Sequence, residues 1–200
     1  MLFRSALPSD DPVVGGEWLH LIDAVRGLPR MADVLEFACG TGIWTRELVT
    51  VADSIVAIDG AHEMLEVNRS KVGSPKVKYQ QGDLFQWKAS ATYDLVFFAF
   101  WLSHVPIDRV DAFLNEAARA VKPGGRMFIA DEPGGGKNAS GPAENNAEQT
   151  RSLQNGNTFR IVKVYYDVDE LAQKLRGLGF SEIDVWNGDY FFTINAMRRA

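Results

Sequence analysis

A glycine-rich turn between an apolar run and a helical pattern limits what this chain can fold into. Residues 33–38 (DVLEFA) are typical of a short buried strand, and residues 43–51 show a helical pattern. Between them, Cys39-Gly40-Thr41-Gly42 supplies two glycines, which let a backbone turn sharply and approach a ligand closely. The helix that follows begins with free N–H groups. The segment therefore predicts a strand–turn–helix unit that can bind a ligand at the turn.

Strand and helix patterns alternate along the rest of the chain, and no internal repeat is present. The helices are expected at residues 17–28, 61–69, 108–121 and 169–178. Further strands are expected at residues 54–59, 77–81, 93–100, 126–130, 181–187 and 190–196, the last two joined by the hairpin turn Asn187-Gly188-Asp189. This alternation predicts an α/β domain with a largely parallel sheet.

The 200 residues fit one domain, in which residues 1–30 are expected to form an N-terminal cap. Residues 132–157 are rich in Gly, Asn, Ala and Glu, and we interpret them as a flexible loop with a short helix at 143–153. Loops of this length are often lids, although an insertion without a role is an equal alternative. Residues 159–166 follow as an extended segment. Its Lys163 is expected to be a solvated surface charge or, alternatively, to bind an acidic substrate.

Charge and composition argue against several classes of partner. The net charge is −5 and the sequence pI is about 5.2, without the basic stripe that a nucleic-acid binder uses. A single cysteine, Cys39, excludes an intrachain disulfide and a zinc site built on paired cysteines, and no metal site is predicted.

No run of about 20 apolar residues could span a membrane, and residues 1–14 do not resemble a signal peptide. We therefore expect a cytoplasmic protein, either a monomer or a homodimer.

The turn departs from two common nucleotide-binding patterns. Dinucleotide-binding turns follow Gly-x-Gly-x-x-Gly, but the third glycine position here is Thr45. The Gly-Lys-Ser/Thr ending of a phosphate-binding loop is also missing. A different cofactor is therefore indicated.

The turn resembles the first motif of the class I S-adenosylmethionine (SAM)-dependent methyltransferases, in which an acid and small residues precede Gly-x-Gly. Glu36, Ala38, Gly40 and Gly42 match this motif, with Ala38 where many members have glycine. Four further motifs occur in the expected order, so that the resemblance covers residues 34–130 well. It implies a Rossmann-like methyltransferase fold: a seven-stranded, mostly parallel sheet with a C-terminal antiparallel strand pair and helices on both faces.

The resemblance also implies which residues bind the cofactor. Glu36 is expected near the ammonium group of the amino-acid tail, Asp59 at the ribose hydroxyls, and Asp83 at the adenine amino group. Asp59 and Asp83 could each instead have a structural role in a turn or cap. The complete set of expected cofactor-binding residues is Glu36, Ala38, Gly40, Gly42, Trp44, Asp59, Gly60, Met64, Asp83, Leu84, Phe98 and Ala99.

The segment after the fourth predicted strand, residues 99–106, faces the transferred methyl group in the family. His104 is the candidate general base, because an unperturbed imidazole titrates near neutral pH; alternatively it bonds a backbone carbonyl. The expected substrate-binding residues are Trp18, His20, Phe100, Trp101 and Asp131. Packing of the next helix is the alternative role for the aromatic residues at 100 and 101.

These features predict a SAM-dependent methyltransferase that moves a methyl group to an oxygen or nitrogen atom of a small molecule by in-line displacement, leaving S-adenosylhomocysteine (SAH). One alternative is an NAD(P)-dependent oxidoreductase, although the third glycine and a Tyr-x-x-x-Lys pair are missing. A non-catalytic partner protein with a methyltransferase fold is a second alternative, and a protein methyltransferase is a third.

Overall fold

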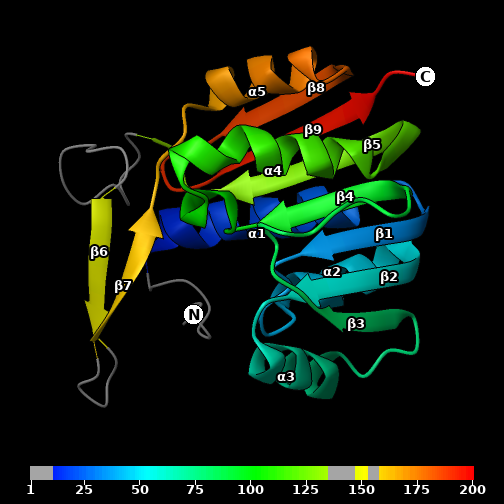
Figure 1. Ribbon diagram of the computed structural model, residues 1–200, viewed down its shortest axis with the longest axis horizontal. Coiled ribbons are helices and arrows are strands. Elements are labelled where there is room, and N and C mark those ends of the chain that lie inside the picture. The colour runs from blue at the N-terminus through cyan, green and yellow to red at the C-terminus, as the bar shows by residue number, and fades with distance from the viewer. Residues whose placement is uncertain (1–10, 135–146, 153–157) are drawn as a thin grey trace.

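The computed structural model describes residues 11–134, 147–152 and 158–200 (Figure 1). Seven strands form the main sheet in the order β3-β2-β1-β4-β5-β9-β8. Strands β1 to β5 are parallel, β9 runs antiparallel to β5, and β8 runs antiparallel to β9. The strands of this sheet are β1 (Met31–Phe37), β2 (Ala52–Asp59), β3 (Val77–Gln81), β4 (Tyr93–Ala99), β5 (Val121–Asp131), β8 (Phe180–Asn187) and β9 (Phe192–Arg198). The predicted fold class is confirmed.

Helices cover both faces of this sheet. In Figure 1, α4 and α5 lie in front of it, and α1 and α2 lie behind it. Neighbouring residues of β4 point to opposite faces, as a pleated strand requires: Phe98 packs in the core on the α4 side, and Phe97 packs in the core with α1 and α2. The helices are α1 (Pro12–Arg26), α2 (Ile43–Val51), α3 (His62–Val72), the short 3-10 helix η1 (Leu102–His104), α4 (Ile107–Arg119) and α5 (Val168–Gly177).

Helix α1 begins five residues before the predicted start. The side chain of Asp11 caps it by accepting a hydrogen bond of 2.8 Å from the backbone N–H of Val13, and Pro12 occupies the first helical position, which proline favours. The cap and the burial of Val14, Leu21 and Val25 together offset the cost of Gly15 and Gly16 inside the helix. By contrast, α2 and β3 have the predicted bounds.

A second, two-stranded sheet corrects the prediction for residues 132–157. Strand β6 (Ala147–Ser152) pairs antiparallel with β7 (Thr158–Lys163), from Ala147 opposite Lys163 to Ser152 opposite Thr158. The short helix expected at 143–153 is therefore wrong over residues 147–152. Pairing with β7 satisfies the backbone of this polar segment without an apolar pattern of its own. Residues 135–146 and 153–157, on which the lid hypothesis mainly falls, lie outside the described residues.

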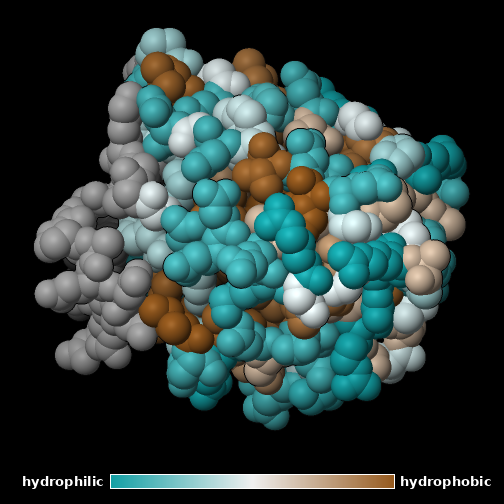
Figure 2. Space-filling view, turned by 90° about the horizontal axis from the view of Figure 1, so that it is seen from above, coloured by the Kyte–Doolittle hydropathy of each residue, from teal (hydrophilic) through white to brown (hydrophobic). Residues whose placement is uncertain are grey.

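The arrows of β1, β4 and β5 point towards the side of the sheet on which β6 and β7 stand (Figure 1). Seen from above, the molecule presents a mainly hydrophilic face with only small apolar patches (Figure 2). In the part of the chain that the structure describes, no helix combines the length and the apolar character needed to cross a membrane.

Candidate cofactor and substrate site

The glycine turn between β1 and α2 has an unusual backbone. Ala38, Gly40 and Gly42 all have positive φ angles, of 51°, 50° and 88°, a region that glycine enters without steric cost. Gly42 is constrained a second time by packing, because a Cβ atom there would lie 2.6 Å from Oδ1 of Asn68 in α3. The turn can therefore lie directly against α3 only with glycine at position 42.

Asp59, the last residue of β2, binds the turn from the side. Its Oδ2 accepts from the backbone N–H of Gly40 and its Oδ1 from that of Ala61, each over 2.9 Å. Asp59 is buried. Because a carboxylate has about four acceptor positions, it keeps capacity for hydroxyl groups of a ligand. Two hydrogen bonds join the end of β2 to the end of β3: the residue after β3, Gly82, donates its N–H to the carbonyl of Asp59, and the side chain of Gln81 donates to the carbonyl of Gly60, the residue after β2.

Glu36, near the end of β1, is buried. The hydroxyl of Thr45 donates to its Oε2 over 2.7 Å. Burial raises the pKa of this carboxyl to about 8, against the effect of the Thr45 hydrogen bond and with a further contribution from the charge of Asp59. Among the described residues, no lysine or arginine forms an ion pair with Glu36. The carboxylate form therefore lacks a cationic partner.

Asp83 occupies the turn after β3 and is exposed. Its two oxygens accept from the backbone N–H of Phe85 and the side-chain amide of Gln86, over 2.9 and 2.8 Å. This is the arrangement of a turn-capping acid. The side chain of Leu84 is buried, whereas Met64, one turn into α3, is partly exposed.

Aromatic residues from distant segments meet beside the glycine turn. Trp18 of α1 lies 5.3 Å from Trp44 of α2, 5.8 Å from Phe100 and 5.9 Å from Phe191, measured between ring centroids. We call these four residues the aromatic cluster. Three of them were predicted as cofactor- or substrate-binding residues, and Phe191 was not, because only the folding of the sheet brings β9 next to β5. A bound molecule at the turn would meet an apolar wall here.

Other predicted residues lie elsewhere. His20 is exposed and stacks on Trp186 of β8, with 4.0 Å between the ring centroids. This contact lies outside the aromatic cluster, which contains no residue of β8. Trp101 packs on the opposite side, against Phe85 and Phe113, and its buried Nε1 has no hydrogen-bond partner among the described residues. The Phe98 side chain is fully buried in the core, and Ala99 is also buried.

His104 is the last residue of η1, and one hydrogen bond defines which of its two ring nitrogens carries the proton. Its Nδ1 lies 2.9 Å from the carbonyl oxygen of Val162. Because a carbonyl oxygen can only accept, Nδ1 carries the proton and Nε2 carries the lone pair. Burial lowers the pKa of the imidazole below its ordinary value; the hydrogen bond to Val162 opposes this effect, and the charge of Lys163 lowers the pKa further. His104 is therefore neutral near pH 7, the form that a general base requires.

Asp131 and Lys163 lie next to this helix. The buried Asp131, at the end of β5, accepts from the backbone N–H groups of Ser103 and Glu132, over 2.9 and 2.8 Å. The amino group of Lys163 contacts Oγ of Ser103 at 2.9 Å and Oε2 of Glu132 at 2.8 Å. Lys163 is buried, so its expected role as a solvated surface charge is wrong. Its two partners are 60 and 31 positions away, a relationship that no local pattern reveals.

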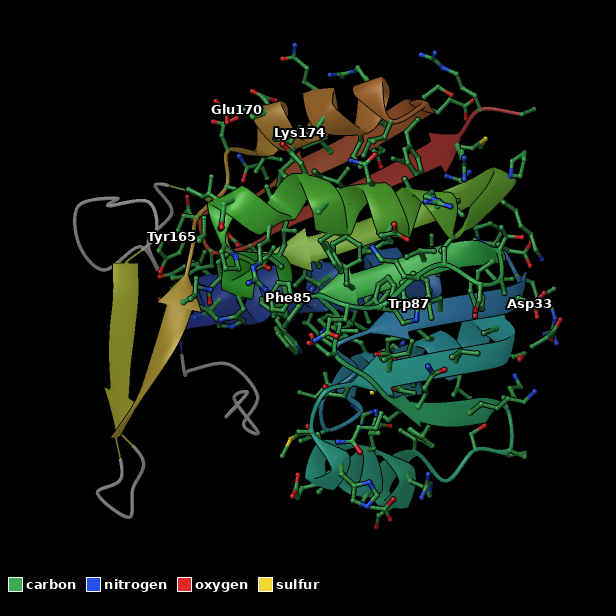
Figure 3. All side chains as sticks on the ribbon, viewed as in Figure 1. Asp33, Phe85, Trp87, Tyr165, Glu170 and Lys174 are labelled. Atoms are coloured by element: carbon green, nitrogen blue, oxygen red, sulfur yellow. The ribbon has the colours of Figure 1, made fainter. Side chains whose placement is uncertain are left out.

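The glycine turn, Asp59, Asp83, His104 and Asp131 lie at or after the carboxyl ends of the parallel strands β1 to β5, where open α/β sheets bind their ligands. Tyr165, whose ring lies 5.3 Å from the Lys163 amino group, is on this side of the sheet, and Asp33 is at the opposite edge (Figure 3). In the described part of the chain, no group of three or more His, Cys, Asp or Glu side chains could hold a metal ion.

Comparison with known proteins agrees with this geometry. A family model described as a methyltransferase domain matches residues 34–125. Demethylmenaquinone methyltransferase of Bacillus licheniformis is 32% identical over 124 residues, which cover 58% of this chain and 51% of the relative. The cypemycin N-terminal methyltransferase of a Streptomyces species is 29% identical over 99 residues, covering 48% and 40%. The chain spans about half the length of the curated relatives it matches.

Two solved structures cover nearly the whole chain. The DhpI–SAH complex is 36% identical, with a TM-score of 0.78, and the match covers 94% of this chain and 87% of that one. The DhpI–SAM–HEP complex is 34% identical, with a TM-score of 0.80 and coverage of 93% and 87%. The chain belongs to the class I family of SAM-dependent methyltransferases.

The residues around the glycine turn fit this cofactor chemically. SAM carries an ammonium group and two ribose hydroxyls. The buried Glu36 lacks a cation among its described neighbours, and Asp59 retains acceptor capacity after its two backbone hydrogen bonds. Glu36 and Asp59 are thus the residues that would hold these two parts of the cofactor.

Proposed function

We propose that this chain transfers the methyl group of SAM to an oxygen or nitrogen atom of a small molecule. The observation that carries the proposal is that three kinds of group lie at the same edge of the sheet, where the parallel strands end: the acids Glu36 and Asp59, the aromatic cluster, and the neutral His104. The DhpI–SAM–HEP complex supports it, because a relative similar over most of this chain is seen with SAM and a second molecule.

The chain's own residues would act mainly by placing the reactants. When bound, SAM supplies a methyl group that is activated by its positively charged sulfur. Alignment of reacting groups can lower a barrier by as much as roughly 7–11 kcal/mol. The aromatic cluster would exclude water from the reacting atoms, and Nε2 of His104 would take the proton that the acceptor loses. A base in this role contributes about 10²- to 10⁴-fold.

The first test is calorimetric titration of the purified protein with SAH, with NAD as the control. Micromolar binding of SAH and none of NAD is expected. Tighter binding of NAD, or no binding of SAH, would refute the proposal and favour an oxidoreductase.

The second test measures methyl transfer from labelled SAM to small phenols, amines and carboxylic acids. Product with an oxygen or nitrogen acceptor is expected. Binding of SAH without turnover on the whole panel would argue for a non-catalytic partner protein instead.

A further inference from the structure

Asn68 of α3, which packs against Gly42 of the turn, is a fully buried polar residue. Its amide lies between the glycine turn, α2 and β3. Nδ2 lies 3.3 Å from the carbonyl oxygen of Cys39 and 2.8 Å from Oγ1 of Thr45. Oδ1 lies 3.0 Å from the hydroxyl of Tyr79. One side chain therefore connects three elements around the cofactor site.

The direction of every hydrogen bond in this group follows from the Cys39 carbonyl, which can only accept. Nδ2 of Asn68 must face Cys39, so Oδ1 must accept from Tyr79. The second N–H of Nδ2 then points to Thr45, and the hydroxyl proton of Thr45 is left for Oε2 of Glu36, 2.7 Å away. The chain of donors runs in one direction, from Tyr79 to Glu36.

Glu36 has no stronger source of stabilisation among its described neighbours. The polar groups that act on its carboxyl are Thr45 of α2 and Asp59 of β2. Cys39 of the turn and Tyr79 of β3 are themselves affected by the charge of Glu36, and β4 places the apolar Phe97 beside it. The cation Arg69 lies over the ring of Tyr79, 5.0 Å from its centroid, and forms no ion pair with Glu36. The donor chain through Thr45 thus opposes burial and the charge of Asp59, which both disfavour the carboxylate.

We propose that Asn68 is a positioning residue of the cofactor site, which acts through Thr45 to hold Glu36 as a carboxylate that receives a cationic group of SAM or SAH. This inference rests on the proposed function, because it concerns the same cofactor. Cofactor binding then requires an ionised Glu36. The affinity for the cofactor therefore rises with pH up to the pKa that Glu36 has in the ligand-free protein, and it is constant at higher pH. Loss of a donor in this chain raises that pKa, so the affinity reaches its constant value at a higher pH.

The experiment measures the dissociation constant of SAH by calorimetry between pH 6 and 9. Thr45→Val replaces one hydroxyl by a methyl group. It is expected to weaken binding about tenfold or more at pH 7, the effect of one hydrogen bond to a charged group, and much less at pH 9. Thr45→Ser keeps the hydroxyl and should follow the wild type. Thr50→Val is the matched control, because the Thr50 hydroxyl bonds the carbonyl of Glu47 on the same helix, away from Glu36.

Asn68→Leu tests the residue itself and should reproduce the pH-dependent loss of Thr45→Val. If it fails to fold, as judged by circular dichroism, Thr45→Val and Thr45→Ser still decide the matter. A readout without ligand is the carboxyl ¹³C shift of Glu36, whose titration should move to higher pH in Thr45→Val.

The outcomes separate the two proposals. Failure of the wild type to bind SAH at any pH would refute the proposed function. Binding by the wild type, with Thr45→Val following the same pH curve or weaker by one constant factor at every pH, would overturn the role of Asn68 alone. Equal effects of Thr45→Ser and Thr45→Val would also overturn it.

Discussion

The backbone N–H of Gly40 donates a hydrogen bond of 2.9 Å to Oδ2 of Asp59, although the two residues lie 19 positions apart. This bond joins the turn after β1 to the end of β2, which are adjacent parallel strands. The two acids proposed to bind the cofactor therefore lie on either side of one hydrogen-bonded turn. Glu36 precedes the turn in the sequence, and Asp59 accepts a hydrogen bond from the turn at Gly40.

Asp59→Asn is expected to weaken SAH binding about 10- to 100-fold, the range for a lost hydrogen bond to a charged group. The amide has one acceptor atom for the two N–H groups that Asp59 now binds, and its NH₂ group would face one of them. Calorimetry measures the effect. Asp53→Asn is the control, because Asp53 is an exposed acid at the other end of the same strand. Unchanged binding by Asp59→Asn would remove Asp59 from the site.

Glu36 should make the protein less stable as the pH rises. Its pKa is raised from 4.5 to about 8 in the folded state, mainly by burial. Between these values the unfolded chain has released the proton and the folded chain still holds it, so stability falls through this window and levels off above pH 8. A tenfold change in proton affinity corresponds to about 1.4 kcal/mol, so the loss amounts to several kcal/mol.

Glu36→Gln should abolish this loss, because an amide stays neutral. Urea unfolding at several values between pH 4.5 and 8.5 should show the variant gaining on the wild type with each step in pH. Glu66→Gln, at an exposed glutamate of α3, should keep the wild-type slope. Parallel pH curves for Glu36→Gln and the wild type would contradict the assigned environment of Glu36.

His104→Gln should lower kcat about 10²- to 10⁴-fold if His104 is the base. The pKa of His104 lies below its ordinary value, mainly through burial. Wild-type kcat should therefore be constant around neutral pH and fall only in acid, where protonation removes the lone pair of Nε2. This acid limb should disappear in the variant. A rate that is insensitive to the substitution would show that the acceptor needs no base from His104.

The sequence predicted the main sheet well because its signals are local. Buried parallel strands are continuous apolar runs, and glycines or caps mark the ends of several helices, as with Asp167, which caps α5 over 2.9 Å. Strand β6 was missed because its backbone is satisfied by β7 rather than by a pattern of its own.

The candidate site was predictable to the extent that its motifs are contiguous. The glycine turn and Asp59 follow from short patterns, whereas the donors around Glu36 do not. Asn68 and Tyr79 meet Thr45 only after three elements have packed together. The same holds for Phe191, which reaches the aromatic cluster from the far end of the chain.

Lys163 offers a test of how β7 is attached to the sheet. Lys163→Met would leave Glu132 without its cation and Ser103 without its donor. Breaking a buried pair from one side costs about 3–5 kcal/mol, and the partial exposure of Glu132, 21% of its side chain, should reduce this to about 1–3 kcal/mol. Urea unfolding measures the loss.

Glu132→Gln in the Lys163→Met background should recover part of this loss, because no unpartnered charge then remains. Lys174→Met is the control, since its pair with Asp111 is exposed and worth at most about 1 kcal/mol. If Lys163→Met is as stable as Lys174→Met, the contacts of Lys163 with Glu132 and Ser103 do not hold β7 against the main sheet and η1. The alternative role of Lys163 in binding an acidic substrate then becomes the better explanation of its burial.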